Sequence, residues 1–451
     1  MTRVLALVDA RALAREPTRP ALRGGTSSLL PDYLAILTDD LARLPGVQVR
    51  ASSPAPNAML EVRSLLNSKS VYFHPPTGTV LVYDEPQGER ALSRAHDILQ
   101  QDPPAMSHPA AASRVGSIEY YATGACNLRC GYCYLGPLAD EPQARDLEPD
   151  GFLQRLDELM GQGRIASRLR VAIIGGEPLL AFAGIRRVID RVAEFGSRHQ
   201  IDVSFGMTTN GYLLTEEVST FLRTHHVAVK ISHDGDYNNR NRPSKAGSDA
   251  RPRPTLERLR ELTDGLSVTI NATLLPPQFA SQAGVFASLV DAGFRRVQIS
   301  VSNGFRWTAD DLRRFFSGLC ELTWEAERRA CMEIQQAHIL DALRDYSLRR
   351  SHCGAGVSHL AFDAAGNVEG CSTSFNRDGH GRDSTYGFYE VDDDPACGPC
   401  AFRYGCGGGC RAFRRDGSPD ITDCAPIYLR FLIAMGLAGD LPGFRSSPHT
   451  M

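Results

Sequence analysis

The sequence predicts an α/β protein: a partial (β/α)6 TIM-like barrel flanked by a small N-terminal α/β domain and a cysteine-rich C-terminal domain. Three observations support this fold. A Pro- and Ala-rich stretch separates the N-terminal residues from the rest of the chain. Six apolar, β-branched runs then alternate with helical segments between residues 118 and 302. Seven of the twelve cysteines follow residue 350. The predicted domains are 1–112, the barrel at 113–307, a bridging helix at 308–350 and the C-terminal domain at 351–451.

The N-terminal domain is predicted to contain a β-hairpin beside helices. Apolar runs at 71–74 and 79–83 flank the turn sequence Pro75-Pro76-Thr77-Gly78, which is typical of a hairpin. The other predicted elements are a strand at 3–8, helices near 28–44 and 87–101, and a linker at 102–113. A free strand edge accepts extended peptides, so we expect this domain either to hold a peptide substrate or its leader, or to cap the barrel.

The barrel is predicted from six strands, most of which are continuous apolar runs, as expected of strands buried on both faces. The strands are 118–123, 169–174, 202–209, 227–232, 267–274 and 296–302, with helices at 149–160, 184–195 and 214–224 and a long helix at 308–349. In such a sheet the functional residues collect at the carboxyl ends of the strands.

Composition narrows the function classes. The 49 basic and 52 acidic residues give a formal net charge of −3, which predicts no general affinity for nucleic acid. No apolar stretch approaches the roughly 20 residues that span a bilayer. The N-terminal apolar run ends at Asp9, too soon for a secretion signal. The sequence therefore predicts a cytoplasmic protein with neither nucleic acid nor a membrane as partner.

Twelve cysteines in a cytoplasmic chain indicate metal binding rather than disulfides. Ten of them form a group of three and a group of seven. The other two, Cys320 and Cys331, lie 11 residues apart in the predicted long helix, and we expect them to be buried structural thiols on nearly one face.

The group of three has the spacing C-x3-C-x2-C: Cys126, Cys130 and Cys133, with Tyr132 just before the last. Three thiolates this close can hold three irons of a [4Fe–4S] cluster and leave the fourth iron open to a reagent. The alternatives are a zinc site or a disulfide knot. Zinc prefers four ligands in paired C-x2-C knuckles, and the triplet has no nearby fourth cysteine.

Short polar motifs follow the next three predicted strands. They read Gly175-Gly176-Glu177-Pro178, Thr208-Thr209-Asn210-Gly211 and Ser232-His233-Asp234-Gly235. Glycines allow close approach to the backbone, the carboxylate can bind a cation, and the amide and hydroxyl groups can hydrogen-bond a ribose or a carboxylate. The competing interpretation is ordinary turn chemistry, which Asn-Gly and Asp-Gly favour. The stretch 243–254 is predicted to be a solvated loop.

Together, the triplet and the GGEP motif resemble the radical S-adenosylmethionine (SAM) enzymes. The resemblance implies that the amino and carboxylate groups of SAM chelate the open iron, and that Glu177 binds the methionine amino group. It implies SAM contacts at Tyr132, Gly175, Gly176, Glu177, Pro178, Thr209, Asn210, Ser232 and Asn271. His233 is a weak candidate for a catalytic base, with a scaffold role as its alternative.

The group of seven resembles the SPASM extension of radical SAM peptide-modifying enzymes. The resemblance implies two auxiliary [4Fe–4S] clusters, one held by Cys353, Cys371 and Cys410, the other by Cys397, Cys400, Cys406 and Cys424. With three thiolates, the first auxiliary cluster would have an open iron or a ligand such as His352. Sulfatase maturases, similar in architecture, carry a catalytic aspartate after the second of these cysteines, where this chain has Ser372.

The expected function is that of a radical SAM peptide or protein maturase with SAM and three [4Fe–4S] clusters. The resemblance implies a 5′-deoxyadenosyl radical that abstracts hydrogen, and a thioether or carbon–carbon crosslink in a ribosomally synthesised precursor peptide. An electron donor such as flavodoxin or ferredoxin is the implied second partner. The alternatives are maturation of a residue in a partner enzyme, of the sulfatase- or quinoprotein-maturase kind, and a non-catalytic iron–sulfur protein.

Overall fold

The computed structural model describes most of the central part of the chain and selected parts of both ends. The described residues are 47–51, 60–64, 69–74, 79–84, 114–135, 149–245, 253–331, 333–344, 353–362, 366–373, 391, 394, 397, 406–410, 424–427, 429–431 and 433. The predicted strand at 3–8, the helices near 28–44 and 87–101 and the linker at 102–113 lie outside them.

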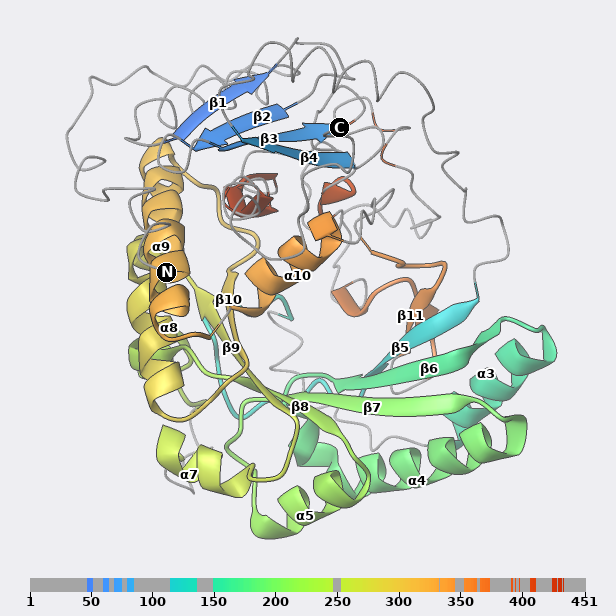
Figure 1. Cartoon of the computed structure of the whole chain (residues 1–451). Helices are drawn as coiled ribbons and strands as arrows, with labels where there is room; N and C mark the ends of the chain where they lie inside the picture. The colour runs from blue at the N-terminus through green and yellow to red at the C-terminus, as the bar shows by residue number, and fades with distance from the viewer. Residues whose placement is uncertain are drawn as a thin grey trace.

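A four-stranded antiparallel sheet forms the described part of the N-terminal domain. Its strands are β1 (Val47–Ala51), β2 (Leu60–Ser64), β3 (Lys69–His74) and β4 (Thr79–Asp84), in the order β1-β2-β3-β4. The β3–β4 pair is the predicted hairpin, with His74 opposite Thr79, so that prediction is confirmed. Within the described residues, β1 and β4 are the edges of this sheet, which lies at the top of Figure 1.

The central sheet contains six parallel strands in chain order, as predicted. They are β5 (Val115–Tyr121), β6 (Ile165–Ile174), β7 (Asp202–Thr209), β8 (Ala228–Ser232), β9 (Val268–Leu274) and β10 (Val297–Val301). The helices are α3 (Pro149–Gly161), α4 (Phe182–His199), α5 (Glu216–Thr224), α6 (Asn238–Asn241), α7 (Leu256–Leu262), α8 (Gln282–Asp291), α9 (Ala309–Arg328) and α10 (Ile334–Arg344). Figure 1 shows α3, α4, α5, α7 and α8 along the outer side of the curved sheet, with α10 on the inner side.

The two faces of this sheet differ in chemistry because side chains alternate along each strand. The outer face is apolar: Ile118 and Tyr120 of β5, for example, are buried in the core, and Tyr120 packs on Phe152 of α3. The residues between them belong to the inner face, which is polar. Its polar members include Ser117, Glu119, Arg168, Arg170, Asp202, Ser204, Thr208, Lys230, Ser232, Thr269, Asn271, Thr273, Gln298 and Ser300.

The sheet also includes two strands that the sequence did not predict. β11 (His359–Phe362) pairs in parallel with β5, with His359 opposite Ser117, and β12 (Val368–Glu369) pairs antiparallel with β11. The cysteine-rich end of the chain, for which no regular pattern was predicted, therefore extends the barrel sheet beyond its first strand.

The predicted single helix at 308–349 is wrong, because the chain breaks between α9 and α10. Ala330 takes a positive φ of 48°, which ends α9, and Cys331 lies in the break rather than on a helical face. Glu333 then accepts hydrogen bonds from the Gln335 and Gln336 amides at 3.2 and 3.0 Å and so caps α10. Cys320 and Cys331 nevertheless pack against the core, as predicted.

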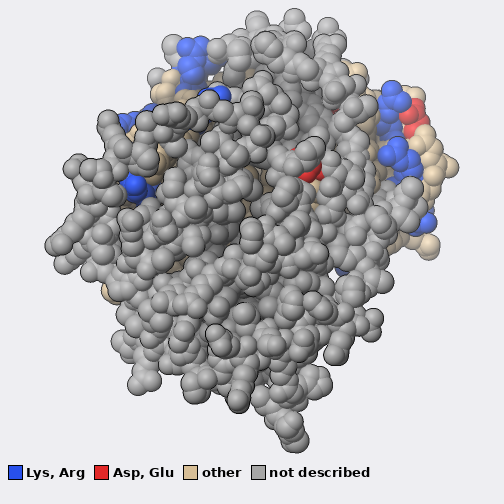
Figure 2. Space-filling model, turned by 90° about the horizontal axis from the view of Figure 1, so that it is seen from above, with Lys and Arg blue, Asp and Glu red and all other residues tan. Residues whose placement is uncertain are grey.

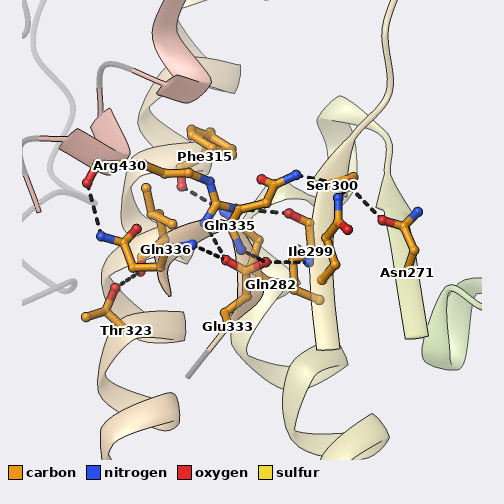
Figure 3. Close-up of polar contacts among 12 residues, drawn as sticks. Asn271, Gln282, Ile299, Ser300, Phe315, Thr323, Glu333, Gln335, Gln336 and Arg430 are labelled. Carbon is orange, nitrogen blue, oxygen red and sulfur yellow. Dashed lines mark hydrogen bonds and ion pairs between the residues drawn. The ribbon is translucent and has the colours of Figure 1, made fainter. Parts of the chain in front are cut away.

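Glu333 also anchors the end of the chain to the barrel. Its carboxylate accepts hydrogen bonds from the Ile299 amide of β10 at 2.8 Å and from the Arg430 guanidinium at 2.6 Å (Figure 3). Arg430 donates also to the Ile299 carbonyl at 2.9 Å, and both charged side chains are at most 3% exposed. The helical segment that carries Arg430 is thereby fixed to β10.

The described surface carries both charge signs. Seen from above, most of the visible Lys, Arg, Asp and Glu side chains of described residues lie at the margins, with basic and acidic groups side by side at one of them (Figure 2). No helix in the described part of the chain is long and apolar enough to cross a bilayer.

Candidate functional site

The cysteine triplet lies on the loop that follows β5, at the carboxyl end of the sheet. All three thiols are partly buried. The Cys133 amide donates to the Cys130 carbonyl at 3.1 Å, and the Leu128 amide donates to the Cys126 sulfur at 3.4 Å. The loop therefore has a defined local turn structure.

The GGEP turn after β6 packs directly on this loop. The Gly176 amide donates to the Thr123 carbonyl at 2.7 Å, and the Glu177 amide donates to the Ala125 carbonyl at 2.8 Å. A Cβ at Gly175 would lie 2.4 Å from the Thr123 oxygen, and one at Gly176 would lie 2.3 Å from the Ala125 oxygen. Contact between the two backbones is sufficient to require glycine at both positions, and their predicted contacts with SAM stay predictions.

Glu177 braces the ends of two strands. Its carboxylate is fully buried and accepts three hydrogen bonds, from the Leu179 amide at 3.1 Å, the Thr209 hydroxyl at 2.7 Å and the Asn210 amide at 2.7 Å. Burial raises the pKa of this carboxyl, and the three donors oppose that rise. The structure thus gives Glu177 a contact set within the protein that the sequence did not predict. Its predicted contact with SAM stays a prediction.

The end of β7 is tied to the same loop. The Asn210 side-chain amide donates to Asn127 at 2.7 Å, and its carbonyl oxygen accepts from the Tyr212 amide at 3.0 Å. Thr209, which is buried, bonds to Glu177 and accepts from the Gly211 amide at 3.0 Å. Both predicted SAM contacts on this strand end are therefore engaged in holding the loop.

A buried ion pair supports the loop from β8. Asp234, with no exposed side-chain surface, accepts from Arg242 at 3.0 Å, from the Thr273 amide at 2.9 Å and from the Tyr132 hydroxyl at 2.6 Å. The Arg242 guanidinium lies 5.2 Å from the centre of the Tyr132 ring. Tyr132, predicted to contact SAM, is thus held between a carboxylate and a cation.

Residues 241–243 dock on the loop, in contrast to the prediction of a solvated loop from 243 onward. The Arg129 amide donates to the Pro243 carbonyl at 2.8 Å, and the Gly131 amide donates to the Asn241 carbonyl at 3.1 Å. No sequence pattern marked Arg242, because an arginine in an Asn- and Arg-rich stretch is normally solvated. Its importance follows only from its buried partner.

The loop thiols of Cys126 and Cys130 are buried enough to disfavour their thiolate forms in the absence of a metal. Burial raises the pKa of Cys126 to about 12 and that of Cys130 to about 11, with Arg242 opposing the rise at Cys130. Metal coordination would stabilise their thiolates. Among the described residues, no three Cys, His, Asp or Glu side chains converge on a point that could hold one ion.

Ser232 and Asn271 lie opposite each other at the ends of β8 and β9. Asn271 belongs to a polar chain on the inner face: its oxygen accepts from the Ser300 hydroxyl at 2.8 Å, and Ser300 accepts from Gln335 of α10 at 3.2 Å (Figure 3). This arrangement leaves both side chains on the polar inner face, as a SAM contact would require.

His233 has the properties of a scaffold residue. Its backbone amide donates to the Asn271 carbonyl at 3.0 Å, and its Nδ1 accepts from the Gly235 amide at 3.1 Å. Burial lowers its pKa to about 4. A general base works best with a pKa near the operating pH, so the scaffold alternative is favoured over the catalytic one.

A second polar group lies where β5 meets β11. The Glu119 carboxylate accepts from the Ser372 amide at 3.2 Å and lies 3.5 Å from the His359 Nε2, and His359 Nδ1 lies 3.0 Å from the Ser117 hydroxyl. Burial pushes the pKa of Glu119 upward, but the hydrogen bonds from His359 and Ser372 outweigh it and leave the pKa below its ordinary value. Glu119 therefore lies beside the residue that follows Cys371.

The structure places part of the predicted auxiliary set. Cys353 and Cys371 are electrostatic neighbours of each other, and Glu119 lies near Cys353. The Cys371 sulfur lies 3.1 Å from the Thr373 hydroxyl. Cys397, Cys406, Cys410 and Cys424 are described and at least partly buried, whereas Cys400 lies outside the described residues. The division of the seven cysteines into two clusters stays a prediction.

The central part of the chain also matches a known family: residues 120–290 match the radical SAM superfamily. These residues form a radical SAM domain. Its cysteine loop, GGEP turn and strand ends are the ones described above.

Similar proteins include enzymes of two kinds. The radical SAM cyclopropyl synthase TigE of Paramaledivibacter caminithermalis is 24% identical over 148 residues, 30% of this chain and 30% of TigE. A serine-type anaerobic sulfatase-maturating enzyme of Klebsiella pneumoniae is 24% identical over 280 residues, 56% of this chain and 67% of that enzyme. The chain thus matches less than a third of TigE and two thirds of the sulfatase-maturating enzyme.

Among solved structures, anSMEcpe with bound AdoMet superposes with a TM-score of 0.54 at 16% identity, over 70% of this chain and 96% of that one. A second anSMEcpe structure, with bound AdoMet and the Kp18Cys peptide, gives a TM-score of 0.55 over 70% of this chain and 96% of that one. At this identity the similarity shows a shared fold.

Proposed function

We propose that this chain is a radical SAM maturase of a peptide or protein substrate, with SAM and three [4Fe–4S] clusters as cofactors. The observation that carries the proposal is the convergence of three strand ends on the cysteine loop. The GGEP turn bonds to the loop backbone, Asn210 bonds to Asn127, and Asp234 bonds to Tyr132. A loop fixed from three sides is what a thiolate triplet needs to hold a cluster in one position.

When bound, a reduced cluster and SAM supply a 5′-deoxyadenosyl radical that can remove hydrogen from an unactivated carbon. The chain's own residues would hold the cluster and orient SAM. Cys126, Cys130 and Cys133 would bind three irons, while Arg242 places a buried positive charge beside Cys130. Ser232 and Asn271 would hydrogen-bond SAM from the inner face of the sheet.

The substrate class rests on the relatives and on the C-terminal cysteines. One similar protein is a cyclopropyl synthase and another a sulfatase-maturating enzyme, and a solved structure of the same fold contains a peptide. The favoured product is a thioether or carbon–carbon crosslink in a ribosomally made peptide. In this proposal the seven C-terminal cysteines hold two auxiliary clusters, flavodoxin or ferredoxin supplies electrons, and the β1 or β4 edge binds the peptide or its leader.

A second candidate is maturation of a residue in a partner enzyme, as in sulfatase maturases. The matched 280 residues favour it. Ser372 weighs against it, because a serine hydroxyl cannot replace an aspartate as a proton acceptor near neutral pH. Glu119, whose carboxylate accepts from the Ser372 amide at 3.2 Å, is the nearest carboxylate that this structure offers there.

Two measurements test this proposal: the metal content of the protein and its ability to cleave SAM. After anaerobic reconstitution we expect about 12 irons and 12 sulfides per chain from three clusters. Replacing Cys126, Cys130 and Cys133 with alanine should leave about eight irons and abolish formation of 5′-deoxyadenosine. The matched control replaces Cys320 and Cys331 and should keep all of the iron. Stoichiometric zinc with negligible iron in the anaerobically purified protein would overturn the proposal.

A further inference from the structure

The inner face of the barrel sheet contains a pair of cations, Arg170 on β6 and Lys230 on β8, besides Arg168, which lies opposite Asp202 at the amino end of β6 and pairs with it at 3.8 Å. Register places them on the polar face: Arg170 is opposite Ser117 and Ser204, and Lys230 is opposite Thr208 and Thr269. All four neighbours across the strands are neutral hydroxyl residues. The neighbouring strands therefore offer neither cation an acid directly opposite it.

The two cations lie close to each other. A Cβ at Gly206, on the strand between them, would lie 3.4 Å from the Arg170 guanidinium, so the arginine extends over this glycine towards β8. The charge of Arg170 acts on Lys230: burial lowers the pKa of the lysine, and the repulsion by Arg170 adds to it. Two cations that repel each other raise the free energy of the protein unless an anion lies between them.

The described part of the chain supplies no such anion. Neither cation makes a hydrogen bond or ion pair with a described residue. The inner face has two acids on the neighbouring strands: Glu119 of β5 is engaged by His359 and the Ser372 amide, and Asp202 of β7 lies opposite Arg168 and pairs with it at 3.8 Å. Lysine is rare in this chain, with three among 49 basic residues, and one of the three, Lys230, lies on this inner face.

The pair lies deeper in the barrel than the strand ends. Lys230 precedes Ser232 by two residues, about 7 Å along a strand, and Arg170 precedes Ile174 by four, about 13 Å. A SAM molecule held at the strand ends would lie above them. The space between the cations is then on the substrate side of the site.

We propose that Arg170 and Lys230 form a carboxylate-binding subsite that positions an acidic group of the peptide substrate inside the barrel. The inference rests on the proposed function, because that function is what makes the substrate a peptide. Arginine binds carboxylates through two parallel hydrogen bonds and lysine adds a point charge, so the pair suits either a Glu or Asp side chain or a C-terminal carboxylate.

Acylation of Lys230 tests this subsite directly. The purified, reconstituted protein is treated with an amine-acetylating reagent, and labelling is measured by mass spectrometry, with Lys69 and Lys245 as internal references. The probes are an alanine pentapeptide with one Glu and both ends blocked, its Gln twin, and an all-alanine pentapeptide with a free C-terminal carboxylate. A carboxylate that raises the lysine pKa by one unit slows labelling about tenfold.

We expect the Glu probe, the free-carboxylate probe or both to slow labelling at Lys230 alone, and their comparison separates a side chain from a chain end. Arg170→Gln should abolish the protection, whereas Arg191→Gln, an exposed arginine on the outer helix α4, should keep it. Equal rates with Glu and Gln probes and no effect of the free-carboxylate probe would overturn the proposal, as would protection that survives Arg170→Gln.

Two outcomes separate the sources of failure. Protection by SAM alone would assign the cations to the carboxylate of the cofactor and refute a substrate subsite. Protection by a peptide carboxylate in a protein that never cleaves SAM would refute the proposed function and leave the subsite intact, because labelling needs no radical chemistry.

Discussion

Replacing Glu177 with glutamine should weaken both the fold and the binding of SAM. The carboxylate accepts three hydrogen bonds with its two oxygens, two of them from the end of β7. A glutamine retains one oxygen, so its NH2 group must face at least one donor. The least costly arrangement leaves the Asn210 amide unpaired and removes one charge-assisted hydrogen bond.

Such a bond is worth about 1.5–3 kcal/mol. At 2–4 °C per kcal/mol for a domain of 150–250 residues, the melting temperature should fall by about 3–12 °C. The same loss frees the strand end that carries Asn210, and we expect SAM affinity to fall about tenfold while the iron content is unchanged. Anaerobic thermal scanning and equilibrium dialysis with labelled SAM measure the two effects.

Two further variants decide how Glu177 acts. Glu217→Gln, on the exposed surface of α5, should change neither quantity. Thr209→Val removes a donor to Glu177 and leaves the charge in place. If the brace is what matters, SAM affinity in Thr209→Val falls in proportion to its melting temperature, as in Glu177→Gln; if only Glu177→Gln weakens SAM binding, the carboxylate contacts SAM directly. An unchanged melting temperature in Glu177→Gln would refute the brace itself.

Two other perturbations test the buried charges and the neutral histidine. Arg430→Met should destabilise the protein by about 3–5 kcal/mol in denaturant unfolding, because it leaves Glu333 buried without its partner. The control Arg314→Met, which breaks a surface ion pair on α9, should destabilise it by less than about 1 kcal/mol. Equal losses of stability in the two variants would contradict the anchoring role of Arg430. The pKa of His233 is about 4 in the folded protein and about 6.5 in the unfolded chain, so between these pH values only the unfolded chain gains a proton. The neutral histidine therefore stabilises the fold fully above pH 6.5, and this stabilisation falls by roughly 3 kcal/mol as the pH drops to 4. Unfolding measured along this pH range should show a shallower loss in His233→Asn, and parallel curves would contradict it.

Much of the barrel was predictable because its strands are continuous apolar runs. β7 has the predicted bounds, β8 and β9 begin one residue later than predicted, and β10 is one residue shorter at each end. β6 begins four residues earlier than predicted, since Ser167 and Arg168 interrupt the apolar pattern at an exposed strand end. β11 has four residues and its partner lies far away in the chain, so no local pattern revealed it.

Roles within the site were harder to predict than its position. The triplet and the GGEP motif fixed where the site lies, but not what Glu177 contacts. Asp234 and Arg242 matter through each other, and a single sequence does not show which charges meet. The break after α9 had no Gly or Pro to announce it, because Ala330 itself takes the positive φ.

The pairing of β11 with β5 has a consequence for the time course of synthesis. Ser117 and His359 are 242 positions apart. At 5–20 residues per second, the ribosome needs about 12–50 s to make the chain between them. During that interval the nascent barrel has an open edge at β5, next to the loop of Cys126, and open edges attract other chains. A chaperone that binds open strand edges would therefore find the β5 edge accessible only before β11 pairs with it.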